Sequence, residues 1–175
     1  MKKILLVAIL FMNLIAVQTY AQCEGTHLLC KKQLSKEDKK AGWNVNKQSE
    51  SLSVEKGETF EMFVTAYQGL EYRLSVCTDI HGGTPVPFQV AQDMMVNVTD
   101  STGNTKIEKQ RKVIFDNAIE TEELYVLFRS NKTEKFYLTI GIPSTGISAS
   151  KKLKKTDFVC LGVLLEHRKT KKSAL

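Results

Sequence analysis

The chain has 175 residues, a hydrophobic fraction of 42% and a formal net charge of +6. This length suits a single domain with a sizeable buried core. The positive charge is too mild for a typical nucleic-acid-binding protein, so nucleic acid is excluded as the expected partner.

Residues 1–21 have the pattern of an export signal. Met1-Lys2-Lys3 precede an apolar run that is interrupted at Asn13. A short positive region, an apolar region and a small-residue cleavage site mark a secretory signal peptide, here cleaved between Ala21 and Gln22. The run is shorter than the about 20 apolar residues of a membrane span, so we expect no transmembrane anchor after cleavage. The sequence therefore predicts a periplasmic or secreted protein of a Gram-negative envelope.

Four cysteines follow the signal region, at Cys23, Cys30, Cys77 and Cys160. An even number in an exported chain predicts two disulfides, for which three pairings are possible. A local Cys23–Cys30 loop with a Cys77–Cys160 bridge is the leading pairing. The crossed arrangement, in which both N-terminal cysteines join the body of the domain, has almost equal support. Their spacing matches no common zinc finger, so we expect no zinc site.

Residues 22–50 are predicted to form a cysteine-containing segment with one short helix. Ser35 is followed three positions later by Asp38, which resembles a capping box. The helix is expected over residues 36–41 and should end at Gly42.

Residues 51–166 have the pattern of a β-domain. Phe60, Met62 and Val64 alternate with polar or outward positions, as they do in half-buried strands. Similar segments separated by turn residues predict eight or nine strands, at residues 52–54, 60–67, 72–77, 86–90, 94–98, 113–115, 124–129, 136–142 and 158–165. The last segment is apolar on both sides, which favours a central or covered strand. We expect a single antiparallel β-sandwich or jelly roll, followed by a basic tail over residues 167–175.

Several of these segments resemble the small modules called pre-peptidase C-terminal domains. The likeness is carried by residues 54–60 (VEKGETF), 72–76 (YRLSV), 96–103 (VNVTDSTG) and 136–140 (FYLTI). The resemblance implies a jelly-roll-like fold and a non-catalytic accessory role. The sequence departs from that family because it has no attached peptidase.

The strand positions opposite the main core suggest a binding face. They carry aromatic and arginine side chains, which can stack on sugar rings or anchor a protein partner. The alternative is that these residues only cover a sheet face or pair across strands. The candidates are Tyr67, Arg73, Tyr125, Arg129 and Tyr137, with Phe63 and Leu127 beside them.

Two other chemistries have candidate residues. His81 follows Asp79 in a glycine-rich loop, which would suit a small secreted hydrolase if a nucleophile lay nearby. Calcium is a possible ligand, because oxygen-rich loops of β-sandwiches often bind it. The calcium candidates are Asp79, Asp93, Asp100 and Asn104, although a polar turn explains Asp100 and Asn104 equally well.

The leading hypothesis is a non-enzymatic binding or accessory module that holds an envelope protein or a glycan on a sheet face. The alternatives are the hydrolase at His81 and a structural subunit of a surface assembly. The latter would use the apolar strand at residues 158–165 if that strand were exposed.

Overall fold

The computed structural model describes residues 23–117, 124–144 and 157–170. The expected signal peptide and its cleavage site lie outside this part of the chain. Among the described residues, no helix has the length and apolar character needed to cross a membrane.

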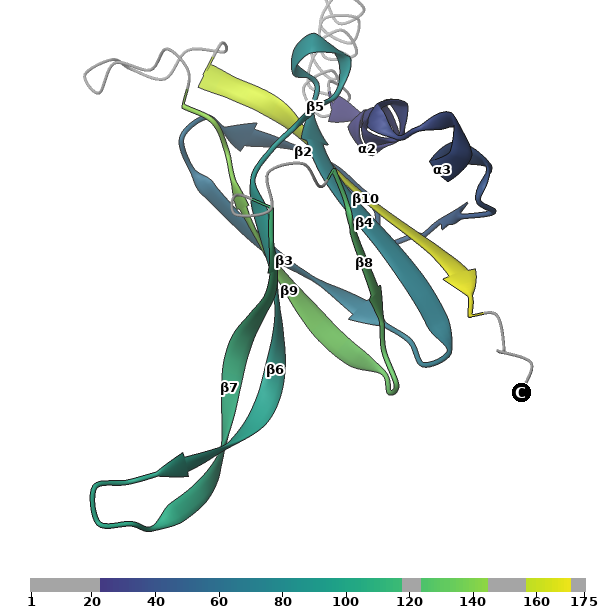
Figure 1. Cartoon of the computed structure of the whole chain (residues 1–175). Coiled ribbons are helices and arrows are strands. Elements are labelled where there is room, and N and C mark those ends of the chain that lie inside the picture. Colours follow the sequence, from purple (N-terminus) through teal and green to yellow (C-terminus); the bar gives the residue numbers. More distant parts are fainter. Residues whose placement is uncertain (1–22, 118–123, 145–156, 171–175) are drawn as a thin grey trace, which may run out of the picture.

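Two antiparallel sheets pack face to face, which confirms the β-sandwich prediction (Figure 1). Sheet A contains six strands, which are β1 (Asn44–Val45), β2 (Glu50–Glu55), β4 (Leu70–Thr78), β5 (Thr84–Pro85), β8 (Val126–Arg129) and β10 (Phe158–Lys169). Sheet B has the order β3-β9-β6-β7, with β3 (Thr59–Ala66), β9 (Glu134–Gly141), β6 (Phe88–Thr99) and β7 (Thr105–Asp116).

Alternation along the strands fills the space between the sheets. Tyr72 and Leu74 of β4 point inward and are fully buried, as are Leu138 and Ile140 of β9. The Tyr72 ring stacks on Phe128 with ring centroids 5.4 Å apart. The inward residues expected from the period-two pattern therefore do form the core.

β10 is central in sheet A, as the apolar pattern predicted. One edge of β10 pairs with β4, and its other edge pairs with β2 and β1. Residues 159–166 are buried, so this strand is not an exposed assembly surface. Its pairing extends past the expected domain boundary at residue 166, because His167 pairs with Tyr72 and Lys169 with Leu70.

The N-terminal segment, defined here as residues 23–43, lies against the outer face of sheet A (Figure 1). It contains α2 (Thr26–Cys30), the 3-10 turn η3 (Lys31–Gln33) and α3 (Lys36–Lys40). α3 confirms the predicted short helix, since the Ser35 hydroxyl accepts the backbone N–H of Asp38 at 3.0 Å. α2 was not predicted.

Both disulfides tie this segment to sheet A. Cys23 is bonded to Cys160 of β10, and Cys30 is bonded to Cys77 of β4. The leading expectation of a local Cys23–Cys30 loop was therefore wrong, and the crossed pairing is correct. Because α2 packs on the sheet, Cys30 at its end and Cys23 shortly before its start face two neighbouring strands rather than each other. The bridges span 137 and 47 residues, and loops of this size stabilise by on the order of 4 kcal/mol each.

α2 approaches β10 so closely that only a glycine fits beneath it. A Cβ on Gly162 would lie 2.6 Å from the backbone nitrogen of His27 and 2.6 Å from the carbonyl carbon of Thr26. Both contacts are with backbone atoms, which cannot rotate away as a side chain could.

Gly162→Ala is therefore expected to lower the free energy of unfolding by about 1–3 kcal/mol through overpacking. Gly141→Ala is the matched control, because it is also a strand glycine and its nearest contact is a comfortable 3.9 Å. Urea denaturation of the oxidised proteins measures both effects. Equal destabilisation by the two substitutions would show that α2 is not packed as described.

β6 and β7 continue beyond the sandwich as a two-stranded arm (Figure 1). β9 pairs with β6 only from Phe88 to Gln92. The rest of β6, up to Thr99, has β7 as its single strand partner among the described residues. The arm is defined here as residues 93–112. Where the structure has β6 and β7, the sequence predicted three short strands at residues 86–90, 94–98 and 113–115, because the polar residues that interrupt the apolar pattern resemble turns.

Candidate functional site

The five residues predicted to share a binding face lie on two different sides of the molecule. Arg73 and Arg129 lie on the outer side of sheet A, and Tyr125 lies next to Arg73. Tyr137 lies on the outer side of sheet B, and Tyr67 follows the end of β3 in that sheet. Alternation correctly separated inward from outward positions, but it cannot tell which sheet an outward residue belongs to.

Arg73 is buried and joins the N-terminal segment to sheet A. Its guanidinium donates to the Glu166 carboxylate at 2.6 and 2.8 Å, and both side chains are almost completely buried. The Arg73 guanidinium carbon lies 5.0 Å from the Trp43 ring centroid and 5.5 Å from that of Tyr125. It also donates to the Asp38 carbonyl at 3.2 Å. Arg73 is therefore a structural residue and is not available to a partner.

Arg129 belongs to a second ion-pair cluster on the same side. Arg129 and Arg168 each donate to Glu71, both at a shortest distance of 2.7 Å. Burial raises the pKa of Glu71, but hydrogen bonds from the two arginines outweigh this effect and lower its pKa overall. Arg168 also lies 4.2 Å from the centre of the Trp43 ring. The outer side of sheet A is thus occupied by the N-terminal segment and by internal ion pairs.

Arg73→Gln and Arg129→Gln are expected to differ strongly. Arg73→Gln removes both hydrogen bonds to the buried Glu166 carboxylate and leaves it only the Lys31 ammonium, 3.4 Å away. Breaking this buried pair should cost about 3 kcal/mol of unfolding free energy. The Arg129 side chain is 64% exposed, so the same substitution there should cost at most about 1 kcal/mol. Denaturant unfolding compares the two variants. Similar losses would contradict a structural role specific to Arg73.

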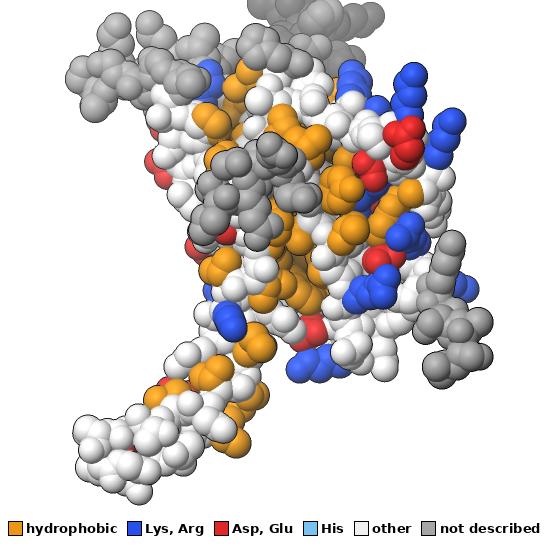
Figure 2. Space-filling view, in the orientation of Figure 1, with side chains coloured by type: hydrophobic (Ala, Val, Ile, Leu, Met, Phe, Trp, Pro, Cys, Tyr) orange, Lys and Arg blue, Asp and Glu red, His pale blue; other side chains and the backbone are white. Residues whose placement is uncertain are grey.

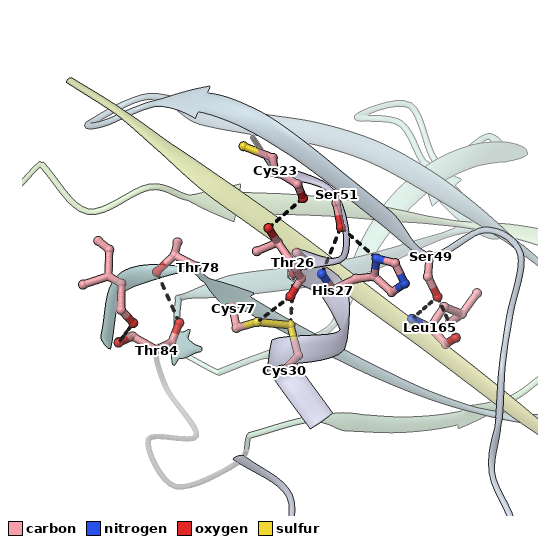
Figure 3. The surroundings of a disulfide bond; sticks show 12 residues. Cys23, Thr26, His27, Cys30, Ser49, Ser51, Cys77, Thr78, Thr84 and Leu165 are labelled. Carbon is pink, nitrogen blue, oxygen red and sulfur yellow. Dashed lines mark hydrogen bonds between the residues drawn. A yellow bond between two sulfur atoms is a disulfide. The ribbon is translucent and has the colours of Figure 1, made fainter. Parts of the chain in front are cut away.

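His27 and Ser51 form a contact that the sequence did not suggest. The His27 Nδ1 atom lies 2.7 Å from the Ser51 hydroxyl, which also accepts the His27 backbone N–H at 3.0 Å (Figure 3). Nucleophilic catalysis would also need an acidic group that orients the imidazole. In the described part of the chain, no carboxylate accepts a hydrogen bond from this ring. The pair instead fastens α2 to β2.

Burial lowers the pKa of His27 from its usual value of 6.5. The unfolded chain therefore binds a proton more readily than the folded protein does. We expect the free energy of unfolding to be highest above about pH 6.5 and to fall as the pH decreases below that value. His27→Gln should reduce this slope, as measured by denaturant unfolding between about pH 7 and pH 5. An unchanged slope would assign the pH dependence to other groups.

The structure does not bring the calcium candidates Asp79, Asp93 and Asp100 together in a metal site. The backbone of His81 lies in the 3-10 turn η4 (Ile80–Gly82), and its side chain is outside the described part of the structure. Asp79 accepts the backbone N–H of Cys160 at 3.1 Å, so it has a structural partner. Asp100 accepts the backbone N–H groups of Thr102 and Asn104 in the polar turn at the tip of the arm. Among the described residues, no three histidine, cysteine or acidic side chains are close enough to hold a metal.

The outer side of sheet B has a different character. Phe63 of β3 is the cross-strand partner of Tyr137 in β9. On the other edge of β9, Tyr137 pairs with Ala91 of β6, which in turn pairs with Val113 of β7. The Phe63 side chain is 50% exposed. The Arg111 guanidinium carbon lies 3.5 Å from the centre of the Tyr137 ring. Two aromatic residues on neighbouring strands therefore lie on this side, with no covering segment among the described residues.

Charged side chains surround Tyr137 in an uneven way. Lys109 and Arg111 both pair with Asp93, and Lys132 pairs with Glu134. The cations are 65%, 53% and 74% exposed, in that order, whereas the two carboxylates are only 19% and 14% exposed. A hydrogen bond from Lys109 is the largest effect lowering the Asp93 pKa, and Asp93 in turn raises the pKa of Lys109.

Two shallow hollows, each of about 270 Å³, flank the Tyr137 ring. One is formed with Glu61, Phe63 and Arg111, and the other lies between Asp93, Lys132 and Lys135. They have room for small groups of a partner and are not deep enough to enclose a substrate.

The same side of the sheet continues onto the arm. Alternate residues of β6 share a face, and cross-strand partners lie side by side, which places Met95 and Ile107 on the Tyr137 side. Met95 is 68% exposed and Ile107 is 66% exposed. Hydrophobic side chains are visible along the arm, whereas its tip is polar (Figure 2). The Tyr137 face is defined here as Phe63, Met95, Ile107, Lys109, Arg111, Val113, Lys132, Lys135 and Tyr137.

Comparison with known proteins identifies a distant structural likeness. No family model and no curated protein sequence matches the chain. Among solved structures, the chain is similar to Aeromonas hydrophila PliG, a periplasmic lysozyme inhibitor of g-type lysozyme. The TM-score is 0.39 at 9% identity, over 73% of this chain and 90% of that chain. The resemblance to pre-peptidase C-terminal domains stays a prediction.

Proposed function

We propose that this chain is an exported, non-enzymatic module that binds a protein partner through the Tyr137 face and the adjoining arm. The main supporting observation is the contrast between the two outer sides of the sandwich. The N-terminal segment covers β4 and β10 on the outer side of sheet A, whereas sheet B presents exposed aromatic, apolar and cationic side chains.

The disulfides support export. Cys23–Cys160 and Cys30–Cys77 join distant parts of the chain, and such structural disulfides persist in oxidising compartments. Together with the signal pattern of residues 1–21, they favour the Gram-negative periplasm or the space outside the outer membrane.

The residue types on the Tyr137 face favour a protein partner. Tyrosine, phenylalanine, methionine and arginine are enriched in protein interfaces. Met95 and Ile107 add exposed apolar surface on an arm that stands away from the sandwich. Exposed apolar surface beside charged side chains is typical of an interaction site.

The test is co-purification of the tagged protein from its native envelope, with quantitative mass spectrometry of the retained proteins. Met95→Ala/Ile107→Ala should lose a partner that the unmodified protein retains, because both side chains would be buried in the interface. Leu28→Ala/Leu127→Ala is the matched control, since these two side chains are each 49% exposed and lie on the sheet A side. All four side chains are exposed, so we expect changes in unfolding free energy within about 0.5 kcal/mol.

Retention of the partner by the control pair, together with its loss from the Met95/Ile107 pair, would support the proposal. If the control pair loses the partner, or if every protein that co-purifies stays with the Met95/Ile107 variant, the Tyr137 face and arm are not the binding surface.

A further inference from the structure

We infer that the Tyr137 face takes an acidic segment of a protein, in which carboxylates lie beside apolar side chains. This inference rests on the proposed function and specifies the chemistry of the partner. Two observations support it: the exposed positive charge of the face, and the cations that lie against its two aromatic rings.

The face presents positive charge although it contains both signs. Lys109, Arg111 and Lys132 extend into solvent, whereas their carboxylate partners Asp93 and Glu134 are largely covered. Glu61, beside Phe63, is an exposed carboxylate on the same side, but a partner approaching this surface still meets mainly ammonium and guanidinium groups. Complementary charge steers association and penalises partners of the same sign.

The positions of the cations favour a carboxylate over a sugar ring. Arg111 lies against the Tyr137 ring, and the Lys135 ammonium lies 4.1 Å from the centre of the Phe63 ring. A sugar would need an open aromatic face for stacking, and each of these rings already carries a cation against its face. Each cation retains donors for a carboxylate, and Arg111 has a planar fork suited to one.

The neighbouring apolar groups favour a protein segment over an anionic glycan. Met95 pairs with Lys109 across the arm, and Val113 lies two residues from Arg111 on the same strand. Such alternation of apolar and cationic groups matches a segment in which acidic and apolar side chains also alternate. A uniformly polar polymer would leave Met95 and Ile107 in contact with its hydroxyl groups.

A second copy of this chain is a poor partner for the Tyr137 face in a two-fold symmetric dimer. A two-fold symmetric contact brings a patch against itself. The exposed cations of the face would then meet the same cations of the other copy, which is unfavourable.

The experiment measures binding of a fluorescent synthetic peptide of alternating glutamate and valine by anisotropy, at several salt concentrations. A glutamine–valine peptide of equal length and an oligogalacturonate of equal charge serve as comparison probes. The test variant is K109Q/R111Q/K135Q. The matched control is K32Q/K36Q/K40Q, which removes the same charge from exposed lysines of the N-terminal segment.

The glutamate peptide should bind the unmodified protein more tightly than either comparison probe. The test variant should weaken this binding by roughly tenfold, as expected for three exposed ion pairs, and the control by less than about twofold. Equal weakening by both variants would overturn the inference, because net charge alone would then explain binding. Tighter binding of oligogalacturonate, or no binding of the glutamate peptide, would also overturn it.

The native partner separates this inference from the proposed function. If M95A/I107A loses the partner and K109Q/R111Q/K135Q retains it, the face is a binding surface but its ligand is not acidic. If M95A/I107A retains the partner, the proposed function itself fails.

Discussion

The attachment of the N-terminal segment to sheet A is the constraint on which the functional account depends. Two disulfides, the absent side chain at Gly162 and the buried Arg73–Glu166 pair all act at this one contact. Together they make β4 and β10 strands that are buried on both sides. They also cover the outer side of β4 and β10, so a partner cannot reach the middle of sheet A.

The buried Arg73–Glu166 pair and the two disulfides contribute differently to the attachment of the N-terminal segment. A buried ion pair has lost much of its hydration and adds little stability of its own, although breaking it is expensive. The disulfides supply stability instead, because they restrict the unfolded chain over long loops. The ion pair helps to fix the position of the N-terminal segment, because Arg73 contacts Trp43 and Asp38 of that segment while it binds Glu166 of β10.

The sequence predicted the inward residues of the strands well and the outward ones poorly. Tyr72 and Leu74 follow a strict alternation that depends only on local geometry. Arg73, like Tyr137, stands at an outward strand position in the sequence pattern. It is nevertheless buried, because the N-terminal segment, which is distant in the sequence, covers it. The cysteine pairing depends on the same distant contact, and so the local pattern could not choose between the alternatives.

The candidate site was predicted in part. Tyr137 and Phe63 were identified as outward aromatic residues, and they do lie side by side on sheet B. Arg111 was missed, because polar residues between apolar ones obscured the long strands β6 and β7. Met95 and Ile107 were missed for the same reason, since their exposure follows from the extension of β6 beyond the end of β9. No pattern in the sequence indicates where a neighbouring strand stops.

The Tyr137 face and the arm form an open surface of the fold, and we propose that a partner binds there. Site-specific photo-crosslinking in the native envelope tests this claim most directly. A photoreactive phenylalanine analogue would replace Ile107 or Phe63 on the Tyr137 face, and Leu127 on the sheet A side. The account predicts crosslinks to one common protein from positions 107 and 63 and none from position 127. Crosslinks to a partner from position 127 alone would contradict it.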